Sequence, residues 1–171
     1  MNMQYVKPIG FIRSEHIKAE DTPIQPVYAQ ECAGTVEILP EYEKGLTDIE
    51  GFSHIILINW LHESESGKCK MLVKPFLEDA EHGVFATRSP CRPNPIGLSI
   101  VRLIKRIGSV LSIQGVDILD GTPVLDIKPY SSLFDCFPDA RNGWQEAVTP
   151  TEAAMRGKRG FRGSAGKENV S

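Results

Sequence analysis

Residues 98–127, LSIVRLIKRIGSVLSIQGVDILDGTPVLDI, contain apolar, β-branched runs separated by two tight-turn dipeptides. Gly108-Ser109 divides 98–107 from 110–118, and glycine supplies the positive φ that a two-residue hairpin turn requires. Asp120-Gly121 follows at once, between VDIL and TPVLDI, and is among the stronger tight-turn dipeptides. This stretch therefore predicts two consecutive hairpins of an antiparallel sheet.

Short β-type runs continue outside this stretch. The full set of expected strands covers residues 5–12, 34–39, 53–61, 70–76, 83–87, 97–107, 110–119 and 122–127. A short helix is expected at 41–46, after Pro40, and Gly45 limits its length. Many strands without long helical periods between them favour a sheet that closes on itself. The predicted fold class is mainly β: a small antiparallel β-barrel with short helices and an irregular C-terminal extension.

The chain length of 171 residues suits one globular domain. We assign residues 1–150 to the barrel domain and 151–171 to a flexible basic tail, because its Gly, Ser and charged residues bury too little apolar surface to offset chain entropy. The tail carries a net charge of +3 within a chain of net charge −3, which leaves −6 on the other residues.

Several classes of protein are disfavoured. The N-terminal residues lack the apolar core of a signal peptide, and the longest apolar run, 55–61, is interrupted by Asn59, so we expect a soluble cytoplasmic protein without a membrane span. The four cysteines are 37, 22 and 45 residues apart, which fits reduced thiols. The four histidines lie in separate segments, so no metal site is expected. The net negative charge argues against nucleic-acid binding through bulk electrostatics.

Residues 83–103, GVFATRSPCRPNPIGLSIVRL, place polar, multi-donor side chains in a rigid loop between two apolar runs. Prolines 90, 93 and 95 restrict the backbone and so lower the entropic cost of holding Arg88, Arg92 and Asn94 in one geometry. A proline-rich turn with solvated arginines is the plain alternative. The density of planar donors favours a binding loop.

A second polar stretch follows at 117–130, DILDGTPVLDIKPY. It combines the tight turn with Asp117, Asp120 and Tyr130 near strand ends. Asp126 and Lys128 share a strand face by alternation and are expected to form a surface ion pair worth less than about 1 kcal/mol.

Four segments together carry a resemblance to a known family: FATRSPCRPNPIG (85–97), VDILDGTPVLDIKPY (116–130), IGFIRS (9–14) and GFSHIILINWLH (51–62). Over residues 6–130 the chain resembles the TsaA-like family, whose TrmO-type members are tRNA methyltransferases. The resemblance implies a small β-barrel, S-adenosylmethionine as cofactor, and a homodimer with the cofactor near the subunit interface. It implies the exocyclic nitrogen of threonylcarbamoyladenosine, at position 37 of tRNA, as methyl acceptor.

The resemblance also implies which residues bind the cofactor: Gln25, His62, Glu63, Arg88, Leu98, Asp117, Ile118, Leu119 and Asp120. Two positions depart from the family pattern. Ile24 stands where the family often has Arg, and Glu63 stands where it often has Gln. An acidic Glu63 suits either a cationic sulfonium or the ribose of the cofactor.

The acceptor nitrogen is conjugated to a carbonyl, so a base that removes its proton would assist methyl transfer. His62, Asp120 and Tyr130 are candidates, and the sequence does not rank them. Phosphates and bases of tRNA would be contacted by Arg88, Arg92, Asn94, Lys128, Arg156, Lys158, Arg159 and Arg162.

Other functions stay open at this point. The acidic pI of about 5.8 suits a methyltransferase for a smaller acceptor on the same fold. The arginine loop also fits a module that binds S-adenosylmethionine or a nucleotide without turnover, or a protein-docking surface.

Overall fold

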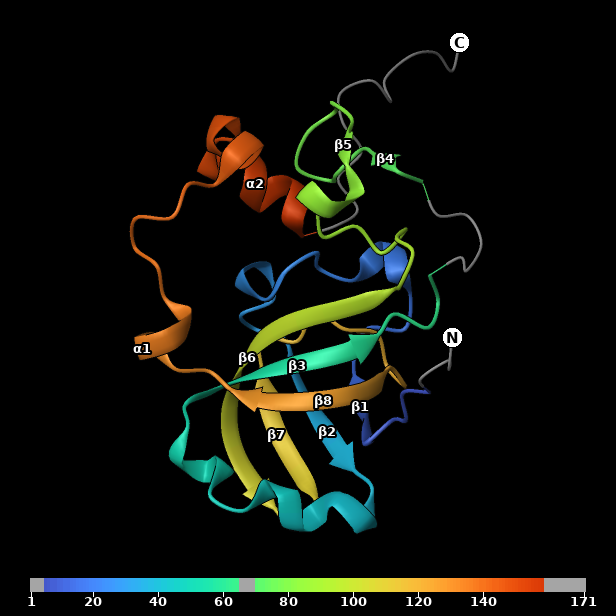
Figure 1. The fold of residues 1–171 in the computed structure, drawn as a ribbon, viewed down its shortest axis with the longest axis vertical. Coiled ribbons are helices and arrows are strands. Elements are labelled where there is room, and N and C mark those ends of the chain that lie inside the picture. The colour runs from blue at the N-terminus through green and yellow to red at the C-terminus, as the bar shows by residue number, and fades with distance from the viewer. Residues whose placement is uncertain (1–4, 65–69, 159–171) are drawn as a thin grey trace.

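The computed structural model describes residues 5–64 and 70–158, which form a β-barrel with a smaller layer over one end (Figure 1). The barrel strands are β1 (Gly10–Ser14), β2 (Ala33–Ile38), β3 (His54–Trp60), β6 (Ile96–Ile107), β7 (Val110–Gln114) and β8 (Pro123–Pro129). They close in the order β1-β2-β7-β6-β3-β8, with antiparallel pairing throughout. A separate two-stranded sheet joins β4 (Leu72–Val73) to β5 (His82–Gly83). The predicted antiparallel barrel is confirmed.

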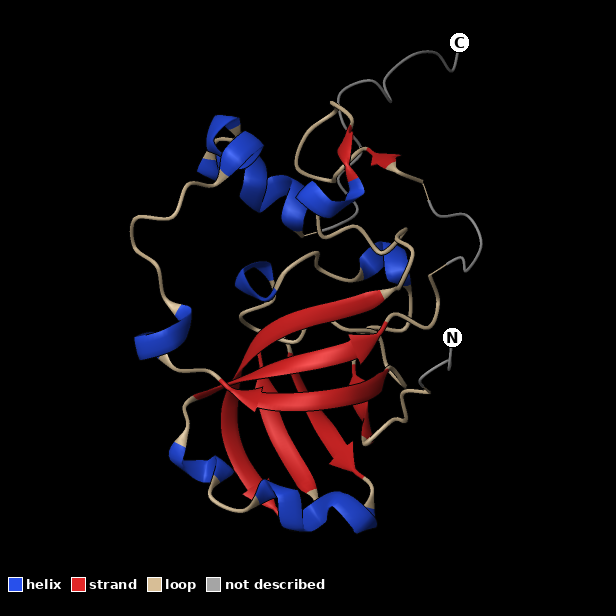
Figure 2. Ribbon diagram, viewed as in Figure 1, coloured by secondary structure: helices blue, strands red, loops and turns tan. Residues whose placement is uncertain are grey.

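The helices are short, and most lie above or below the barrel in the view of Figure 2, whereas the helix at Ser132–Asp135 lies at its side. The 3-10 helices are η1 (Ala19–Asp21), η2 (Pro26–Tyr28), η3 (Pro40–Leu46), η4 (Ile49–Gly51), η5 (Val84–Ala86) and η6 (Gly143–Ala147). The α-helices are α1 (Ser132–Asp135) and α2 (Pro150–Gly157). The helix predicted at 41–46 is thus present as the 3-10 helix η3.

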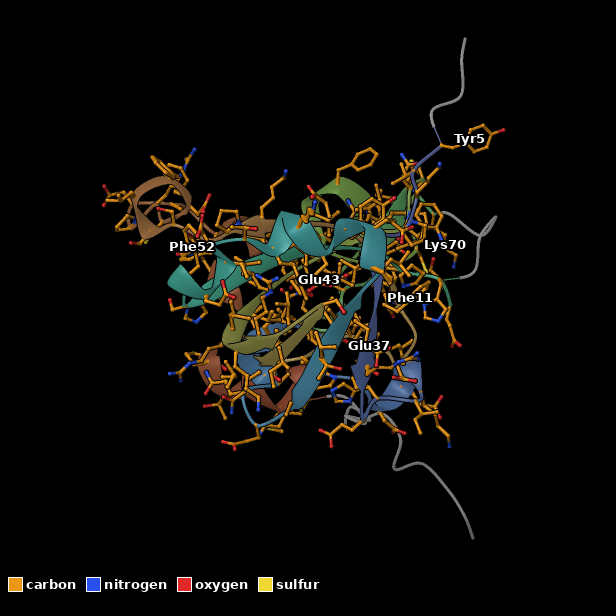
Figure 3. The ribbon with its side chains drawn as sticks, turned by 90° about the horizontal axis from the view of Figure 1, so that it is seen from below. Tyr5, Phe11, Glu37, Glu43, Phe52 and Lys70 are labelled. Atoms are coloured by element: carbon orange, nitrogen blue, oxygen red, sulfur yellow. The ribbon has the colours of Figure 1, made fainter. Side chains whose placement is uncertain are left out.

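One end of the barrel is covered by η3 and η4. Figure 3 views the molecule from this end and labels Glu43 of η3, Phe11 of β1 and Glu37 of β2. Phe11 and Glu37 are partners in the β1–β2 ladder. Leu46, at the end of η3, is buried in the core and so anchors the cover to the barrel. The opposite end of the barrel holds the polar residues of the candidate functional site.

Alternation along the strands builds the core. Ile55 and Leu57 of β3, Val101 of β6 and Leu111 of β7 are almost fully buried, and each faces the barrel interior. β-branched and aliphatic side chains at every second position fill the closed interior, where burial of each large side chain contributes about 1.5–3 kcal/mol. The outward-facing positions of the same strands are more exposed.

The first predicted hairpin is confirmed. Ile107 of β6 pairs with Val110 of β7 across Gly108-Ser109, and Gly108 has φ of +59°. The ladder shifts register between Leu103 and Lys105, which adds a bulge to the long strand β6. A bulge increases local twist and helps a sheet to curl.

The second predicted hairpin is wrong. Gly121 does take a positive φ of +73°, as the turn requires, but β8 pairs with β3 and β1 instead of β7. The turn is tied to the first strand: Gly121 N donates to Ile12 O over 2.9 Å, and Ser14 N donates to Asp120 Oδ1 over 3.1 Å. A tight turn reverses the chain without specifying the partner strand. Residues 115–122 therefore cross the end of the barrel.

Several predicted strands are shorter than expected. The run at 5–12 enters a strand only at Gly10, the run at 70–76 has only Leu72–Val73 in a strand, and the run at 110–119 leaves its strand at Gln114. The run at 83–87 is mostly the 3-10 helix η5, in which Val84 packs inward and Thr87 Oγ1 donates to Val84 O over 2.9 Å. Local hydrogen bonding replaces a ladder there.

The structure also differs from the flexible tail expected from residue 151. Residues 150–157 form α2, which Thr149 caps together with Glu152 in a capping box, with Pro150 in the first turn. Ile24 N donates to Gly157 O over 2.9 Å, and Arg156 pairs with Asp79 over 3.2 Å. The capping signal, Thr149 followed three residues later by Glu152, is already present in the sequence. Arg159 and Arg162 lie outside the described residues.

Candidate functional site

A cavity of about 760 Å³ lies at the end of the barrel where β3 ends and β6 begins. Its walls come from widely separated segments: 19–28, 59–64, 74–77, 88–92, 96–100, 117–122 and 144–145. Pockets of 300–1,000 Å³ with a few convergent polar groups are typical small-molecule sites. The cavity is therefore the candidate functional site.

The proline-rich loop forms one wall. Arg88 Nη1 donates to Gln25 Oε1 over 2.7 Å, which joins two segments that are 63 residues apart in the chain. Arg92 Nη1 donates to Thr87 O over 3.3 Å, so the second guanidinium is held by the loop's own backbone. Both arginines and Gln25 line the cavity, so the loop brings these side chains to one site.

Asp117 supplies a carboxylate beneath this wall. Ser99 Oγ donates to Asp117 Oδ1 over 2.6 Å, and both residues line the cavity. Burial raises the pKa of Asp117 to about 6, against the opposing effects of the Ser99 hydrogen bond and the Arg88 charge. The carboxylate is therefore charged at neutral pH and titrates just below it.

Asn59 lies at the inner end of the cavity, on β3. Its side chain is 1% exposed, and its Oδ1 has no hydrogen-bond partner among the described residues. Its partner across the ladder is Gly97 on β6, which has no side chain. A buried carbonyl oxygen without a donor costs about 1–3 kcal/mol, so a donor that reached this atom would offset that cost.

His62 and Glu63 follow β3 at the rim of the cavity. Thr122 Oγ1 and His62 Nδ1 are 3.3 Å apart, and Thr122 is buried. This contact holds the imidazole against the start of β8. Both His62 and Glu63 are exposed, which keeps their polar groups within reach of a bound molecule.

Most of the predicted cofactor residues come together here. The cavity is lined by Gln25, His62, Glu63, Arg88, Leu98, Asp117, Ile118 and Leu119, and by Arg92 from the predicted tRNA set. Asp120 is exposed and outside the cavity lining, where it caps the end of β1 by accepting from Ser14 N. Asn94 is likewise exposed and outside the lining.

Other predicted residues are far from the cavity. Tyr130 follows β8 at the opposite end of the barrel, where its N donates to His54 O over 3.2 Å. Lys128 makes the expected ion pair with Asp126 over 2.8 Å on the outer surface. Of the three candidate bases, His62 alone lines the cavity in the described part of the chain.

The cavity is also lined by residues that sequence reasoning did not predict, among them Asn59, Ser99, Thr122 and Trp144. The first two had a signal, because each is a polar residue at an inward position of an otherwise apolar strand. Trp144 had none, because it reaches the cavity through tertiary contacts. Its Nε1 donates to Ala86 O over 2.8 Å, and its ring stacks on His82 with centroids 4.6 Å apart.

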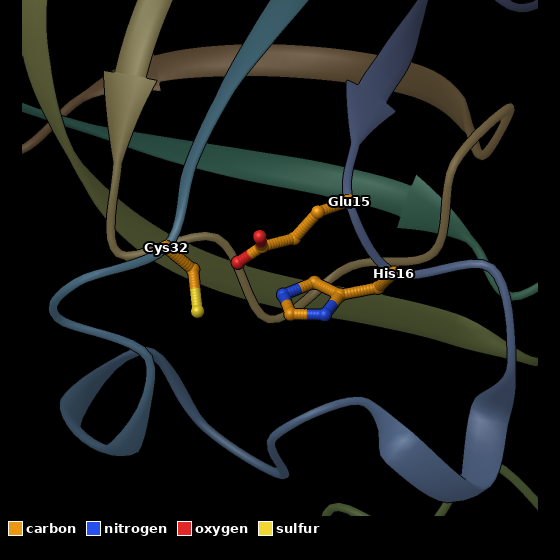
Figure 4. A group of neighbouring side chains, drawn as sticks. All are labelled: Glu15, His16 and Cys32. Carbon is orange, nitrogen blue, oxygen red and sulfur yellow. The ribbon is translucent and has the colours of Figure 1, made fainter.

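A second polar group contains Glu15, His16 and Cys32, whose potential metal-ligating atoms lie within 4.8 Å of one another (Figure 4). His16 Nε2 is 2.8 Å from Val116 O, so this ring nitrogen already has a protein partner. Burial, followed by the hydrogen bond and charge of Glu15, raises the pKa of the Cys32 thiol. The neutral thiol and the engaged imidazole make these residues a poor fit for a metal ion.

The outer face of β3 and β6 is apolar next to the cavity. Ile56, Ile58 and Trp60 lie opposite Ile100, Leu98 and Ile96 in the ladder. Trp60 is 39% exposed, and Ile96 and Leu98 are each 43% exposed. A contiguous apolar patch of this kind is typical of a protein interface.

Among residues 5–64 and 70–158, no helix has the length and apolar character needed to cross a membrane.

Comparison with known proteins gives a consistent result. The sequence profile described as tRNA-methyltransferase O N-terminal domain matches residues 11–136. A Pyrococcus abyssi protein named as a probable S-adenosyl-L-methionine-binding protein is 53% identical, over 82% of this chain and 75% of its own length. The Escherichia coli tRNA (adenine(37)-N6)-methyltransferase is 34% identical, over 86% of this chain and 66% of its own length.

A solved structure agrees with these sequence matches. The crystal structure of TrmO from Pseudomonas aeruginosa superposes with a TM-score of 0.70 at 40% sequence identity. The match covers 84% of this chain and 63% of the crystallised chain. This chain therefore spans just under two thirds of the TrmO structure and of the E. coli enzyme.

Proposed function

This chain belongs to the tRNA-methyltransferase O N-terminal domain family, and from that premise we propose that it is an S-adenosylmethionine-dependent tRNA methyltransferase. We propose the exocyclic nitrogen of threonylcarbamoyladenosine at position 37 of tRNA as the acceptor, and the cytoplasm as the site of action. The observation that carries the proposal is the convergence of family-matched residues from five segments on one cavity.

The cavity residues fit the proposed cofactor. The carboxylates of Glu63 and Asp117 suit its cationic groups, and the joined pair Gln25 and Arg88 offers polar contacts for its carboxylate or ribose. Asn59 Oδ1 is a buried acceptor that a nucleoside can satisfy. When bound, S-adenosylmethionine supplies an electrophilic methyl group on a positively charged sulfur.

The protein's main contribution is positioning. Holding two reactants close and aligned can lower a barrier by roughly 7–11 kcal/mol, so few catalytic side chains are required. We propose His62 as the group that accepts the proton of the acceptor nitrogen. It lines the cavity with its Nδ1 beside Thr122, and its exposed position leaves the ring accessible to an entering nucleotide.

The tRNA contacts would start at the rim of the cavity. Arg92 and Arg88 lie there, on the proline-rich loop. Lys128 and Arg156 are paired with Asp126 and Asp79, so each would contact phosphate only by sharing or exchanging its partner. Asn94, Lys158, Arg159 and Arg162 complete the proposed set. Contacts to base edges would select the RNA sequence, and contacts to phosphates would fix the position and orientation of the tRNA.

We also propose a homodimer with the cofactor near its interface. The apolar face of β3 and β6 supports this proposal. Ile96, Leu98 and Ile100 belong to that face and also line the cavity, so a partner on this face would lie next to the cofactor. A second copy seated there would bury Trp60 and narrow the cavity. Trp60→Glu should convert the dimer to a monomer in light scattering, and unchanged mass would contradict the proposed face.

The test of the reaction uses labelled S-adenosylmethionine and two preparations of the same tRNA, with and without threonylcarbamoyladenosine. Label should enter only the modified tRNA. Label in both preparations would contradict the proposed acceptor. Transfer to small amines or thiols but not to tRNA would indicate a different methyltransferase. Cofactor binding without transfer to any acceptor would indicate a binding module.

A further inference from the structure

The orphaned carbonyl of Asn59 needs a donor that the described residues do not supply. Asn59 is buried and lines the cavity, one residue before the end of β3. Ser99, the neighbouring polar residue of the barrel interior, directs its hydroxyl to Asp117 instead. A buried acceptor that lines a cavity and lacks an internal partner points to a ligand N–H or O–H.

The surroundings of Asn59 are apolar and closely packed. Its ladder partner is Gly97, where a Cβ atom would lie only 2.8 Å from Leu61 Cδ2. Any side chain at this position would crowd Leu61 and the wall beside Asn59. Leu61 and Gly97 both line the cavity, so the amide lies beside apolar groups. A polar edge reading a planar ring, with apolar groups on its faces, is the usual form of a base pocket.

The cofactor offers two kinds of N–H donor, and their charges differ. The α-ammonium carries a positive charge and therefore favours the carboxylates of Glu63 and Asp117. The 6-amino group of the purine is neutral, and an asparagine amide matches its edge, because it accepts from the amino group and donates to a ring nitrogen. Of these two N–H donors, the neutral one is the better match for the neutral amide.

Resting on the proposed function, we propose that Asn59 selects the adenine base of the methyl donor by accepting a hydrogen bond from its 6-amino group. Asn59 then determines which nucleoside the cavity admits, and the carboxylates hold the amino-acid end. A site built to hydrogen-bond a substrate amino group rejects an analogue that lacks it, since the buried acceptor is left unpaired.

The test measures binding of S-adenosylhomocysteine by calorimetry, without turnover. Its matched ligand is the analogue whose purine carries hydrogen instead of the 6-amino group. The wild-type protein should bind S-adenosylhomocysteine about tenfold or more tightly than the analogue. Asn59→Leu should bind both ligands with equal, reduced affinity. Ser99→Ala, also at an inward position beside the cavity, should keep the wild-type preference for the amino group.

A second measurement guards against a misfolded variant. Leucine has the same branching and number of side-chain non-hydrogen atoms as asparagine and removes the orphaned acceptor, so free Asn59→Leu should melt at or above the wild-type temperature. Equal wild-type affinity for the two ligands, or a preference that survives in Asn59→Leu, would overturn this inference and leave the proposed function standing. Failure of the wild-type protein to bind S-adenosylhomocysteine would overturn both.

Discussion

Ser99 Oγ donates a 2.6 Å hydrogen bond to Asp117 Oδ1, and this contact ties strand β6 to the segment that crosses the end of the barrel. The hydroxyl favours the charged carboxylate, whereas burial favours the neutral acid. The balance between them determines the pH at which the cavity gains a negative charge.

Binding of the cationic methyl donor should therefore depend on pH through Asp117. Because the pKa of Asp117 is raised to about 6, the carboxylate is mostly charged at pH 7 and mostly neutral at pH 5. Affinity for S-adenosylmethionine should fall about tenfold between these values. Calorimetry at both pH values tests this, with Asp117→Asn as the variant that should bind weakly and without the pH dependence.

Ser99→Ala extends the same experiment. Loss of the hydroxyl removes a contact that lowers the pKa of Asp117, so the midpoint of the pH dependence should move above 6. A midpoint that stays in place, or moves down, would show that Ser99 does not set the charge of Asp117.

Arg88→Ala should weaken cofactor binding by about tenfold, because it removes a charged wall residue and releases Gln25. Arg13→Ala is the matched control. Arg13 is paired with Glu37 on the barrel surface, so its loss should leave cofactor affinity unchanged. Equal affinities in wild type and Arg88→Ala would remove the arginine from the cofactor site.

Gly157→Ala should destabilise the contact between α2 and the 3-10 helix η2, which contains Tyr28. A Cβ atom at this position would lie 2.3 Å from Tyr28 Cδ2, so the ring has to move. Overpacking of this kind costs about 1–3 kcal/mol in urea unfolding. At Gly51, an added Cβ meets nothing within 4 Å, so Gly51→Ala is the control and should change stability little. Equal stability of the two variants would argue against close packing at Gly157.

A chain ending at Lys158 should bind tRNA less tightly and bind cofactor normally. The removed residues include Arg159, Arg162 and Lys167, and each lost phosphate contact lowers the salt slope by roughly 0.7–0.9. Fluorescence anisotropy of labelled tRNA over a range of salt concentrations measures both quantities. The same affinity and slope in the shortened chain would mean that these residues do not contact RNA.

The barrel was predictable because its signal is local. Alternation and a glycine-containing turn define β6 and β7, and neither depends on distant residues. The error at Asp120-Gly121 arose from a long-range effect, because closure of the barrel determines which strands pair with β8. The same holds for η5, where a run of β-type residues lies outside the sheet and folds through its own hydrogen bonds.

The candidate site was predictable where family motifs cover it. Arg88, His62 and Asp117 were found in this way. Asn59 and Ser99 are visible in the sequence as polar residues within apolar strands. That they line the cavity follows only from their position on the inward face of the closed barrel. Trp144 could not be found, because only the folded C-terminal segment brings its ring to His82.

The pairing of the first and last barrel strands has a consequence for the newly synthesised chain. Gly10 pairs with Val124, and the segment carrying Asp117 is fastened to residues 12–16 of the N-terminal strand region. Most of the chain must therefore leave the ribosome before this seam can form. A half-made chain lacks the cavity walls that residues 88–122 and 144–145 contribute, so tight ligand binding would mark completed molecules.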